Sequence, residues 1–314
     1  MPDPPAGGGT FDGRAVLALL AVQVCYATFP VLGKIAMREI PPFVVAAFRV
    51  VSGAAFLTVV ARLLAPAPKF DRRDRWTLAG VSMLGIVANQ TLFVNGLART
   101  TATNTTLLTT TIPVFTLLLA VLFRVEKASL RPFLGVPLAL AGVLLLLDLR
   151  RVHLGTATLT GDLLIAVNSI CYAGFLVAWR GILTRHPAIT VTAAVFRWGA
   201  APVLLLALPD ALKFRPSEVH AGPWAALAGV ILLSTLLAYS LTAWALARTM
   251  PSTAAVFAYV QPLLAISLAF LVLGERPGPR TGVAAMLIFA GVGLTTIPRR
   301  TAAPVSPGGA EAVR

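Results

Sequence analysis

Long runs of apolar residues alternate with short polar segments along almost the whole chain. Each run has about 20 residues, the length that an α-helix needs to cross the hydrocarbon core of a bilayer. A transmembrane barrel would instead show shorter segments of alternating hydropathy. The pattern predicts ten transmembrane helices, at residues 14–34, 43–64, 76–96, 101–123, 132–149, 162–180, 190–208, 224–246, 252–273 and 281–298.

The composition supports a membrane protein, with 57% hydrophobic residues, 12% charged residues and a mean hydropathy of +0.84. Soluble domains carry about 25% charged residues, so this chain has too few charges to cover a surface in water. The net charge of +14 does not indicate nucleic-acid binding, because the basic residues lie mainly between the apolar runs. The segments 1–13 and 299–314 are predicted to be disordered. We therefore expect an all-α membrane protein.

The distribution of lysine and arginine predicts the orientation of the chain. If the N-terminus lies in the cytoplasm, the loops at 62–75, 124–131 and 180–185 are cytoplasmic, and this side carries more basic residues than the other. Cytoplasmic loops are generally richer in lysine and arginine. The sequence thus predicts a multi-pass protein of the plasma or inner membrane with both termini in the cytoplasm.

The chain contains an internal repeat. The segment Leu97-Ala98-Arg99-Thr100 recurs as Leu246-Ala247-Arg248-Thr249, 149 residues later. Other matches between the two halves are Pro113 with Pro262, Glu126 with Glu275, Cys25-Tyr26-Ala27 with Cys171-Tyr172-Ala173, and Ala47-Phe48-Arg49 with Val195-Phe196-Arg197. Each half is therefore predicted to be one five-helix unit, at residues 14–149 and 162–298.

An odd number of helices in each unit determines the predicted geometry. The second unit must enter the membrane from the opposite side, so the two units form an inverted repeat about an axis in the membrane plane. Such repeats are typical of alternating-access carriers that bind their substrate near the midplane. The expected fold is therefore ten transmembrane helices arranged as two inverted five-helix repeats.

The order of these motifs resembles that of EamA-type domains of the drug/metabolite transporter superfamily. The first half shows an aromatic first helix at 25–29, Ala47-Phe48-Arg49, Pro113, Glu126 and Gly142, and the second half repeats the order through Tyr172, Arg197, Pro262, Glu275 and Gly291. The resemblance covers residues 14–298. It implies a ten-helix carrier of small metabolites, amino acids or drugs, and it favours export over import.

Polar and aromatic residues near the middle of the spans are the candidates for solute binding. Tyr26 and Tyr172 occupy matching positions, which an inverted repeat brings toward each other, and Gln90 matches Tyr239. The alternative for each residue is hydrogen bonding between helices. The full set of expected substrate-binding residues is Tyr26, Phe29, Asn89, Gln90, Tyr172, Phe175, Tyr239, Tyr259 and Gln261, with Asn168 as further lining.

Three matched pairs are candidates for gate or structural roles. Arg49 and Arg197 lie about two turns inside their spans, where an arginine either ties helices together or recognises a carboxylate or phosphate. Glu126 and Glu275 either satisfy nearby cations and helix N-termini or act as latches on opposite faces. Pro113 and Pro262 are predicted to kink the fourth and ninth helices.

The sequence indicates no catalytic, metal or cofactor site. The acidic residues, Asp162 included, lie at predicted helix ends, in loops or in tails, so we expect no proton antiport driven by a carboxylate at mid-span. The three histidines lie in short loops, which disfavours a membrane enzyme. A membrane enzyme or a scaffold without transport activity remains the alternative. The expected partners are a small-molecule solute and the lipid bilayer, without nucleic acid; a homodimer is left open.

Overall fold

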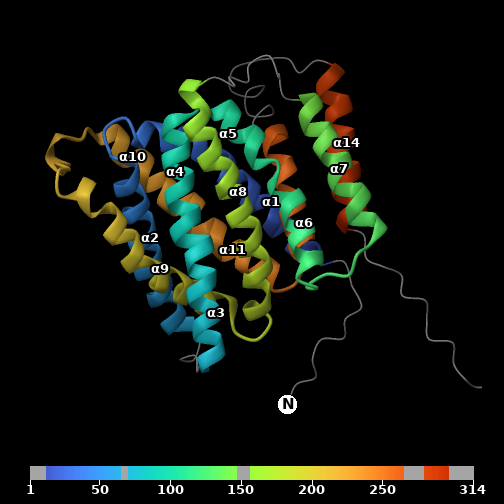
Figure 1. The fold of residues 1–314 in the computed structure, drawn as a ribbon, viewed down its shortest axis with the longest axis horizontal. Helices are drawn as coiled ribbons and strands as arrows, with labels where there is room; N and C mark the ends of the chain where they lie inside the picture. Colours follow the sequence, from blue (N-terminus) through green and yellow to red (C-terminus); the bar gives the residue numbers. More distant parts are fainter. Residues whose placement is uncertain (1–11, 65–69, 147–155, 265–278, 297–314) are drawn as a thin grey trace, which may run out of the picture.

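The computed structural model describes residues 12–64, 70–146, 156–264 and 279–296, and every regular element in these ranges is helical. Figure 1 shows them as one bundle. The elements are α1 (Gly13–Ala36), α2 (Pro42–Leu64), α3 (Arg72–Ser82), η1 (Met83–Ala88), α4 (Asn89–Arg99), α5 (Ala102–Thr109), α6 (Ile112–Leu122), α7 (Leu130–Leu146), α8 (Thr156–Leu183), α9 (Ala188–Ala211), η3 (Pro216–Glu218), α10 (Ala221–Gly229), η4 (Val230–Leu237), α11 (Ala238–Leu246), α12 (Pro251–Val256), η5 (Phe257–Val260) and α14 (Pro279–Thr296).

Six helical spans in the described residues are long and apolar enough to cross a membrane. They are Gly13–Ala36, Pro42–Leu64, Arg72–Arg99, Thr158–Leu183, Ala188–Ala211 and Ala221–Leu246, and shorter apolar helices cover Leu107–Leu122, Leu130–Leu145 and Gly282–Thr296. The chain is therefore an all-helical, multi-pass membrane protein. Six spans meet this criterion of length and hydropathy, so the prediction of ten transmembrane helices is not confirmed. Parts of the fifth, ninth and tenth predicted spans lie outside the described residues.

The predicted fourth span is interrupted rather than continuous. Helix α5 ends at Thr109, and α6 starts at Ile112 with Pro113 in its first turn. Proline has no N–H to donate and clashes with the preceding turn, so a helix restarts there more easily than it continues. In the second half, the 3₁₀ turn η5 ends at Val260, two residues before Pro262. The backbone is thus irregular before both matched prolines.

The third and eighth spans each contain a π-helical segment, η1 and η4, at corresponding places. Such segments widen the helix locally and are frequent at functional sites. Each one ends close to a polar side chain that points into the bundle. Asn89 directly follows η1, and Tyr239 is the second residue after η4. The hydrophobic pattern gave no sign of either segment.

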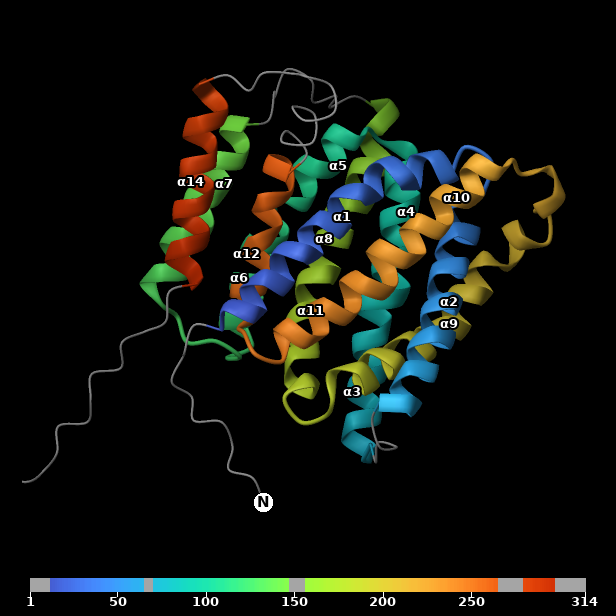
Figure 2. The same ribbon diagram turned by 180° about the vertical axis from the view of Figure 1, so that it is seen from behind.

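Helices from the two halves pack against each other in matched pairs. Helix α2 packs along α9, and α7 packs along α14, which form a pair at one side of the bundle in Figures 1 and 2. Helix α1 packs against α10, η4 and α11, while α8 packs against α3, η1 and α4. Close backbone approach at the α7–α14 contact needs glycine, because a Cβ on Gly291 would lie 2.5 Å from the Ala139 nitrogen.

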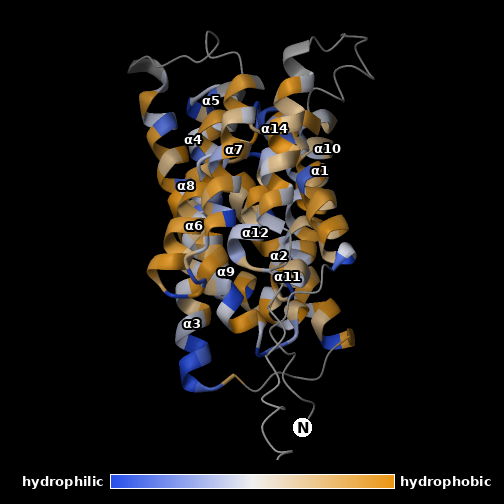
Figure 3. Cartoon of the chain, turned by 90° about the vertical axis from the view of Figure 1, so that its right-hand side faces the viewer, coloured by the Kyte–Doolittle hydropathy of each residue, from blue (hydrophilic) through white to orange (hydrophobic). Residues whose placement is uncertain are grey.

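Large apolar side chains cover much of the outer surface of the bundle. Leu63 is 77% exposed, Leu130 is 74% exposed and Leu205 is 70% exposed. Figure 3 shows hydrophobic helices through the bundle and a hydrophilic start of α3 at one end. An apolar surface of this kind would aggregate in water and suits contact with lipid.

Candidate functional site

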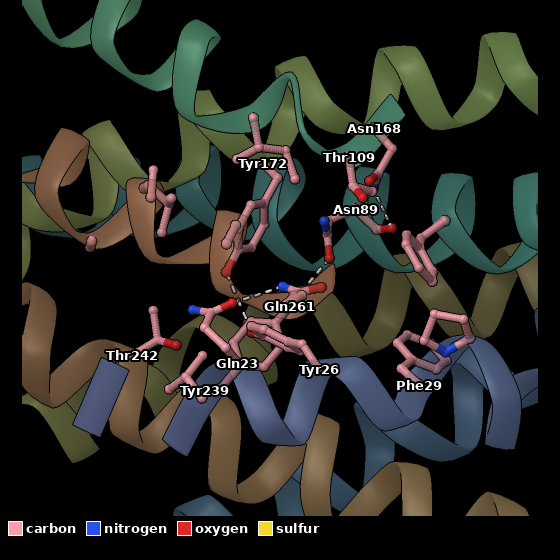
Figure 4. Close-up of a pocket in the computed structure, with 18 of the residues that line it drawn as sticks. Gln23, Tyr26, Phe29, Asn89, Thr109, Asn168, Tyr172, Tyr239, Thr242 and Gln261 are labelled. Atoms are coloured by element: carbon pink, nitrogen blue, oxygen red, sulfur yellow. Dashed lines mark hydrogen bonds between the residues drawn. The ribbon is translucent and has the colours of Figure 1, made fainter. Parts of the chain in front are cut away.

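A cavity lies among α1, α2, α4, α5, α6, α8, α11 and α12, which come from both halves of the chain. Its volume is about 110 Å³. Figure 4 shows polar and aromatic side chains that point into it from different helices. Its walls combine rings, amides and hydroxyls with aliphatic groups, as small-molecule sites generally do. The lining residues are Leu19, Val22, Gln23, Tyr26, Phe29, Pro30, Arg49, Asn89, Phe93, Thr105, Thr109, Ile112, Asn168, Tyr172, Leu176, Tyr239, Thr242, Ala254, Ala255, Ala258 and Gln261.

Two polar pairs join helices of the first half to helices of the second half across the cavity. The hydroxyl oxygens of Tyr26 in α1 and Tyr172 in α8 lie 3.4 Å apart. The Gln261 side-chain nitrogen donates to Gln23 Oε1 at 2.7 Å. Both contacts can be exchanged for contacts to a solute, because a hydroxyl and an amide can each donate and accept.

A hydrogen-bond network centred on Tyr239 forms another part of the wall. Gln90 Nε2 donates to the Tyr239 hydroxyl at 3.1 Å, and this hydroxyl lies 3.1 Å from both the Gly85 carbonyl oxygen and Asn89 Oδ1. The Asn168 side chain donates to the Asn89 carbonyl oxygen at 2.9 Å. The two π-helical segments thus bring their following residues into one network between the halves.

The cavity also contains one buried cation. Arg49 in α2 is 2% exposed, its Nε donates to Thr235 Oγ1 at 3.0 Å, and its guanidinium carbon lies 4.0 Å from the centre of the Phe29 ring. Phe29 in turn stacks on Phe93, with ring centres 4.8 Å apart. No aspartate or glutamate is among the described residues that line the cavity, so its electrostatic character is positive.

Most of the residues expected to bind solute line the cavity, but three do not. Tyr26, Phe29, Asn89, Tyr172, Tyr239 and Gln261 line it, together with Asn168. Gln90 donates a hydrogen bond to the Tyr239 hydroxyl but does not line the cavity itself. Phe175 stacks on Trp179 with ring centres 4.4 Å apart, and Tyr259 is fully buried outside the cavity wall. These three residues do not line this cavity, because a position at mid-span does not determine the direction of a side chain.

Sequence reasoning missed several lining residues or gave them another role. Gln23 and Phe93 were not considered, although Gln23 lies one turn before Tyr26 and shares its face of α1. Thr105 and Thr109, in the threonine-rich segment 100–111, also line the cavity and were not among the expected binding residues. Arg49 was placed among gate or structural residues, with solute recognition as the alternative.

The two arginines that the repeat appeared to pair have different surroundings. Arg197 is exposed on α9, whereas Arg49 is buried. The buried positions of α2 and α9 coincide at a spacing of 146 residues, which places Gly53 on Gly199 and Arg49 on Val195. The match of Ala47-Phe48-Arg49 with Val195-Phe196-Arg197 is therefore two residues out of register.

Glu126 lies at the start of another helix. Its carboxylate accepts the Ser252 N–H at 2.8 Å and the Ser252 hydroxyl at 2.5 Å, in the first turn of α12. A carboxylate at this place stabilises the positive end of the helix. Its matched residue, Glu275, lies outside the described residues, so a pair of latches stays a prediction.

Asp162 lies within a helix rather than at its start, because α8 already begins at Thr156. It is 8% exposed, and its carboxylate accepts hydrogen bonds from the Thr100 hydroxyl at 2.5 Å and from Asn104 Nδ2 at 3.0 Å. It does not line the cavity. The helix starts six residues earlier than predicted, and the carboxylate lies in the first two turns of α8 rather than at mid-span.

No group of three or more metal-ligating side chains occurs in the described part of the chain. The cavity is a chamber with polar, aromatic and cationic walls inside a membrane-spanning bundle. The model of the EamA-like transporter family matches residues 13–148 and 159–297. This chain belongs to the EamA-like transporter family. The resemblance noted in the sequence is confirmed, and membership identifies the chain as a membrane transport protein.

Relatives in this family share most of the chain. An uncharacterized transporter from Archaeoglobus fulgidus is 27% identical over 290 residues, covering 91% of this chain and 98% of the relative. A probable terminal-alkyne amino-acid exporter from Streptantibioticus cattleyicolor is 30% identical over 236 residues, covering 73% of this chain and 75% of the relative. A solved crystal structure with 17% identity covers 92% of this chain and 99% of its own with a TM-score of 0.75, so the fold is shared.

Proposed function

We propose that this chain exports a small organic solute across the inner membrane by alternating access, with the cavity as the binding site. The observation that carries the proposal is the pair of matched tyrosines, Tyr26 and Tyr172, whose hydroxyls meet in a chamber between the two halves. A chamber at the contact between two repeats is where carriers bind their substrate. The proposed role is transport without catalysis, in line with relatives that are named transporters.

Two loop contacts support an inverted arrangement of the two repeats. Glu39, in the turn between α1 and α2, accepts the His220 N–H at the start of α10, with an oxygen–nitrogen distance of 2.8 Å. Asp74, near the start of α3, lies 2.6 Å from His186 in the turn between α8 and α9. The turns after α1 and after α8 are equivalent in the repeats, yet they contact opposite ends of the bundle, as an inverted pair would.

The proposed direction of transport and orientation of the chain rest on separate observations. Export is favoured by the resemblance and by the printed name of the Streptantibioticus relative. Cytoplasmic termini follow from the excess of lysine and arginine in the loops assigned to the inside. With this orientation, the Asp74–His186 contact lies on the cytoplasmic side and the Glu39–His220 contact on the opposite side.

Flux through reconstituted vesicles tests the proposal. The purified chain is placed in liposomes that are offered a mixture of amino acids, organic acids and nucleosides, and the solutes that cross are quantified by mass spectrometry. We expect Tyr26→Ala and Tyr172→Ala to lower the flux about tenfold or more, because the loss of a hydrogen bond and an aromatic contact costs about 1–3 kcal/mol.

Tyr259→Phe is the matched control, because Tyr259 is also a buried tyrosine but does not line the cavity. Its flux should equal that of the unmodified chain. If Tyr26→Ala, Tyr172→Ala and Tyr259→Phe all transport at the rate of the unmodified chain, the cavity is not the transport site. Absence of flux for every solute in the mixture, with folded protein in the vesicles, would contradict the transport function itself.

A further inference from the structure

Arg49 is a buried cation whose hydrogen-bonding capacity is only partly used. Its Nε donates to Thr235, but the Nη1 atom is buried without a hydrogen-bond partner among the described residues. The Phe29 ring covers one face of the guanidinium. A guanidinium offers five N–H donors in a planar fork, so Arg49, which lines the cavity, has donor capacity left for an acceptor.

Placing a cation inside a membrane span is costly unless another group compensates its charge. No carboxylate does so here, because neither aspartate nor glutamate is among the described residues lining the cavity. Thr235 supplies a dipole and Phe29 supplies a ring face, and neither carries a negative charge. The missing component of this site is an anion.

Comparison of the halves indicates that the scaffold does not need an arginine at this position. In the register that matches the burial of α2 and α9, the equivalent residue is Val195, which is fully buried. An apolar side chain thus satisfies the same packing position in the second half. Arg49 therefore breaks the symmetry of the repeat at the cavity, where a single solute must bind in one orientation.

We propose that Arg49 binds the carboxylate of the transported solute. The proposal rests on the proposed function and names the substrate class. A carboxylate accepts two parallel hydrogen bonds from the edge of a guanidinium, and both groups then neutralise each other inside the bundle.

The rest of the wall indicates what the carboxylate is attached to. Aromatic rings of Tyr26, Phe29, Phe93 and Tyr172 and the aliphatic Leu19, Val22 and Leu176 face the same space. Together they suit an apolar or aromatic body of the solute. The described lining residues offer no carboxylate to balance an ammonium group, so the site favours an organic monocarboxylate over an organic cation.

Binding to the purified full chain in nanodiscs tests the proposal without any variant. Calorimetric titrations compare 3-phenylpropionate, benzoate and hexanoate with the amide of each acid and with 3-phenylpropylamine. We expect at least one acid to bind roughly tenfold or more tightly than its amide, since a charged hydrogen-bond pair is stronger than a neutral one. If no acid binds more tightly than its amide, or if the amine binds best, the proposal is wrong.

Variants then assign the selectivity to a residue. Arg49→Gln should weaken binding of the acid roughly tenfold to hundredfold and leave binding of its amide unchanged, and Arg49→Lys should retain part of the preference for the acid. Arg197→Gln is the matched control, because it removes the same charge from an exposed position on α9. Unchanged preference in Arg49→Gln, or an equal loss in Arg197→Gln, would overturn the assignment.

Flux measurements separate this inference from the proposed function. If vesicles export solutes and Arg49→Gln exports neutral solutes and carboxylates at the normal rates, the chain is a carrier but Arg49 is not the anchor. If carboxylates bind through Arg49 and no solute crosses the membrane, the carboxylate site at Arg49 is supported and the proposed transport function is contradicted. Should Arg49→Gln not fold, the comparison of acid with amide in the unmodified chain and in Arg49→Lys decides.

Discussion

Gly85 lets the ring of Phe175 lie directly against the backbone of the third span. A Cβ at Gly85 would overlap this ring, which is fully buried and stacked on Trp179. The Gly85 carbonyl oxygen also lies 3.1 Å from the Tyr239 hydroxyl, so the close approach holds a cavity residue in place. A methyl group here must therefore displace a packed ring or the backbone that contacts Tyr239.

Gly85→Ala is expected to destabilise the protein by about 1–3 kcal/mol, the usual cost of overpacking a core. The control is Gly181→Ala in α8, where an added Cβ has no neighbouring atom within 4 Å. This control should be neutral or stabilising by up to about 1 kcal/mol, because alanine favours a helix over glycine. The measurement is the midpoint of thermal unfolding in detergent. Equal midpoints for the two variants would contradict the observed packing.

For single residues, the sequence predicted which side-chain types occur near the middle of the bundle better than it predicted where each side chain points. Tyr26 and Tyr172 each stand in the middle of a Cys-Tyr-Ala triplet, so the repeat predicted that these two positions approach each other, and their hydroxyls lie 3.4 Å apart. The arginine motif was misleading. A slip of two residues rotates a helix position by roughly 200°, so Arg197 points outward although its neighbours resemble those of Arg49. Burial, which only the structure gives, was needed to find the register.

Among the elements, the turn between α1 and α2 is held to the start of α10 by Glu39. Its carboxylate accepts the His220 N–H at 2.8 Å and lies 3.0 Å from His220 Nδ1. The hydrogen bond from the His220 backbone N–H is the main reason why the pKa of Glu39 is lower than its ordinary value of 4.5, and the His220 side chain adds to this effect. The ionised carboxylate is therefore the form that holds the turn.

This contact should depend on pH in one direction. Because the folded-state pKa of Glu39 is lowered, its contribution to stability is present above pH 4.5 and is lost as the pH falls through the lowered value. We expect Glu39→Gln to lower the thermal midpoint at pH 7 and to lower it progressively less as the pH falls below 4.5. Glu218→Gln is the control, because Glu218 forms an exposed ion pair with Arg215, and its loss should change the thermal midpoint little. A Glu39→Gln effect that does not decrease as the pH falls below 4.5 would mean that charge is not the cause.

The elements themselves were predictable to different degrees. Runs of about 20 apolar residues gave the six long spans, because only a helix satisfies its backbone within lipid. The interruption between α5 and α6 was foreseen as a kink at Pro113. The π-helical segments η1 and η4 were not, because an extra residue in one helical turn leaves the hydrophobic run unchanged. They matter for the site, since Asn89 and Tyr239 follow them closely.

For the whole molecule, the arrangement of the halves determines whether one cavity can open to either side. Matched helices pack in pairs, α2 with α9 and α7 with α14, and the cavity lies between the halves. Equivalent turns that face opposite sides would allow the two halves to exchange conformations, so that the solute is released on one side and bound on the other. A parallel duplication would place equivalent turns on the same side and would lack this exchange.

Labelling of single cysteines with a membrane-impermeant maleimide on intact cells distinguishes the two arrangements. Cys25 and Cys171 are first replaced by alanine, and then Arg38→Cys and Thr184→Cys are compared, because these exposed residues lie in equivalent turns of the two repeats. We expect Arg38→Cys to be labelled from outside and Thr184→Cys only after permeabilisation. Ser217→Cys and Arg72→Cys form the second matched pair. Ser217 lies near His220, which contacts the turn after α1, so it should be labelled from outside; Arg72 lies near Asp74, which contacts the turn after α8, so it should be labelled only after permeabilisation. Labelling of Arg38→Cys and Thr184→Cys from the same side would exclude the inverted repeat, whereas a reversal of all four results would preserve the repeat and place both termini outside.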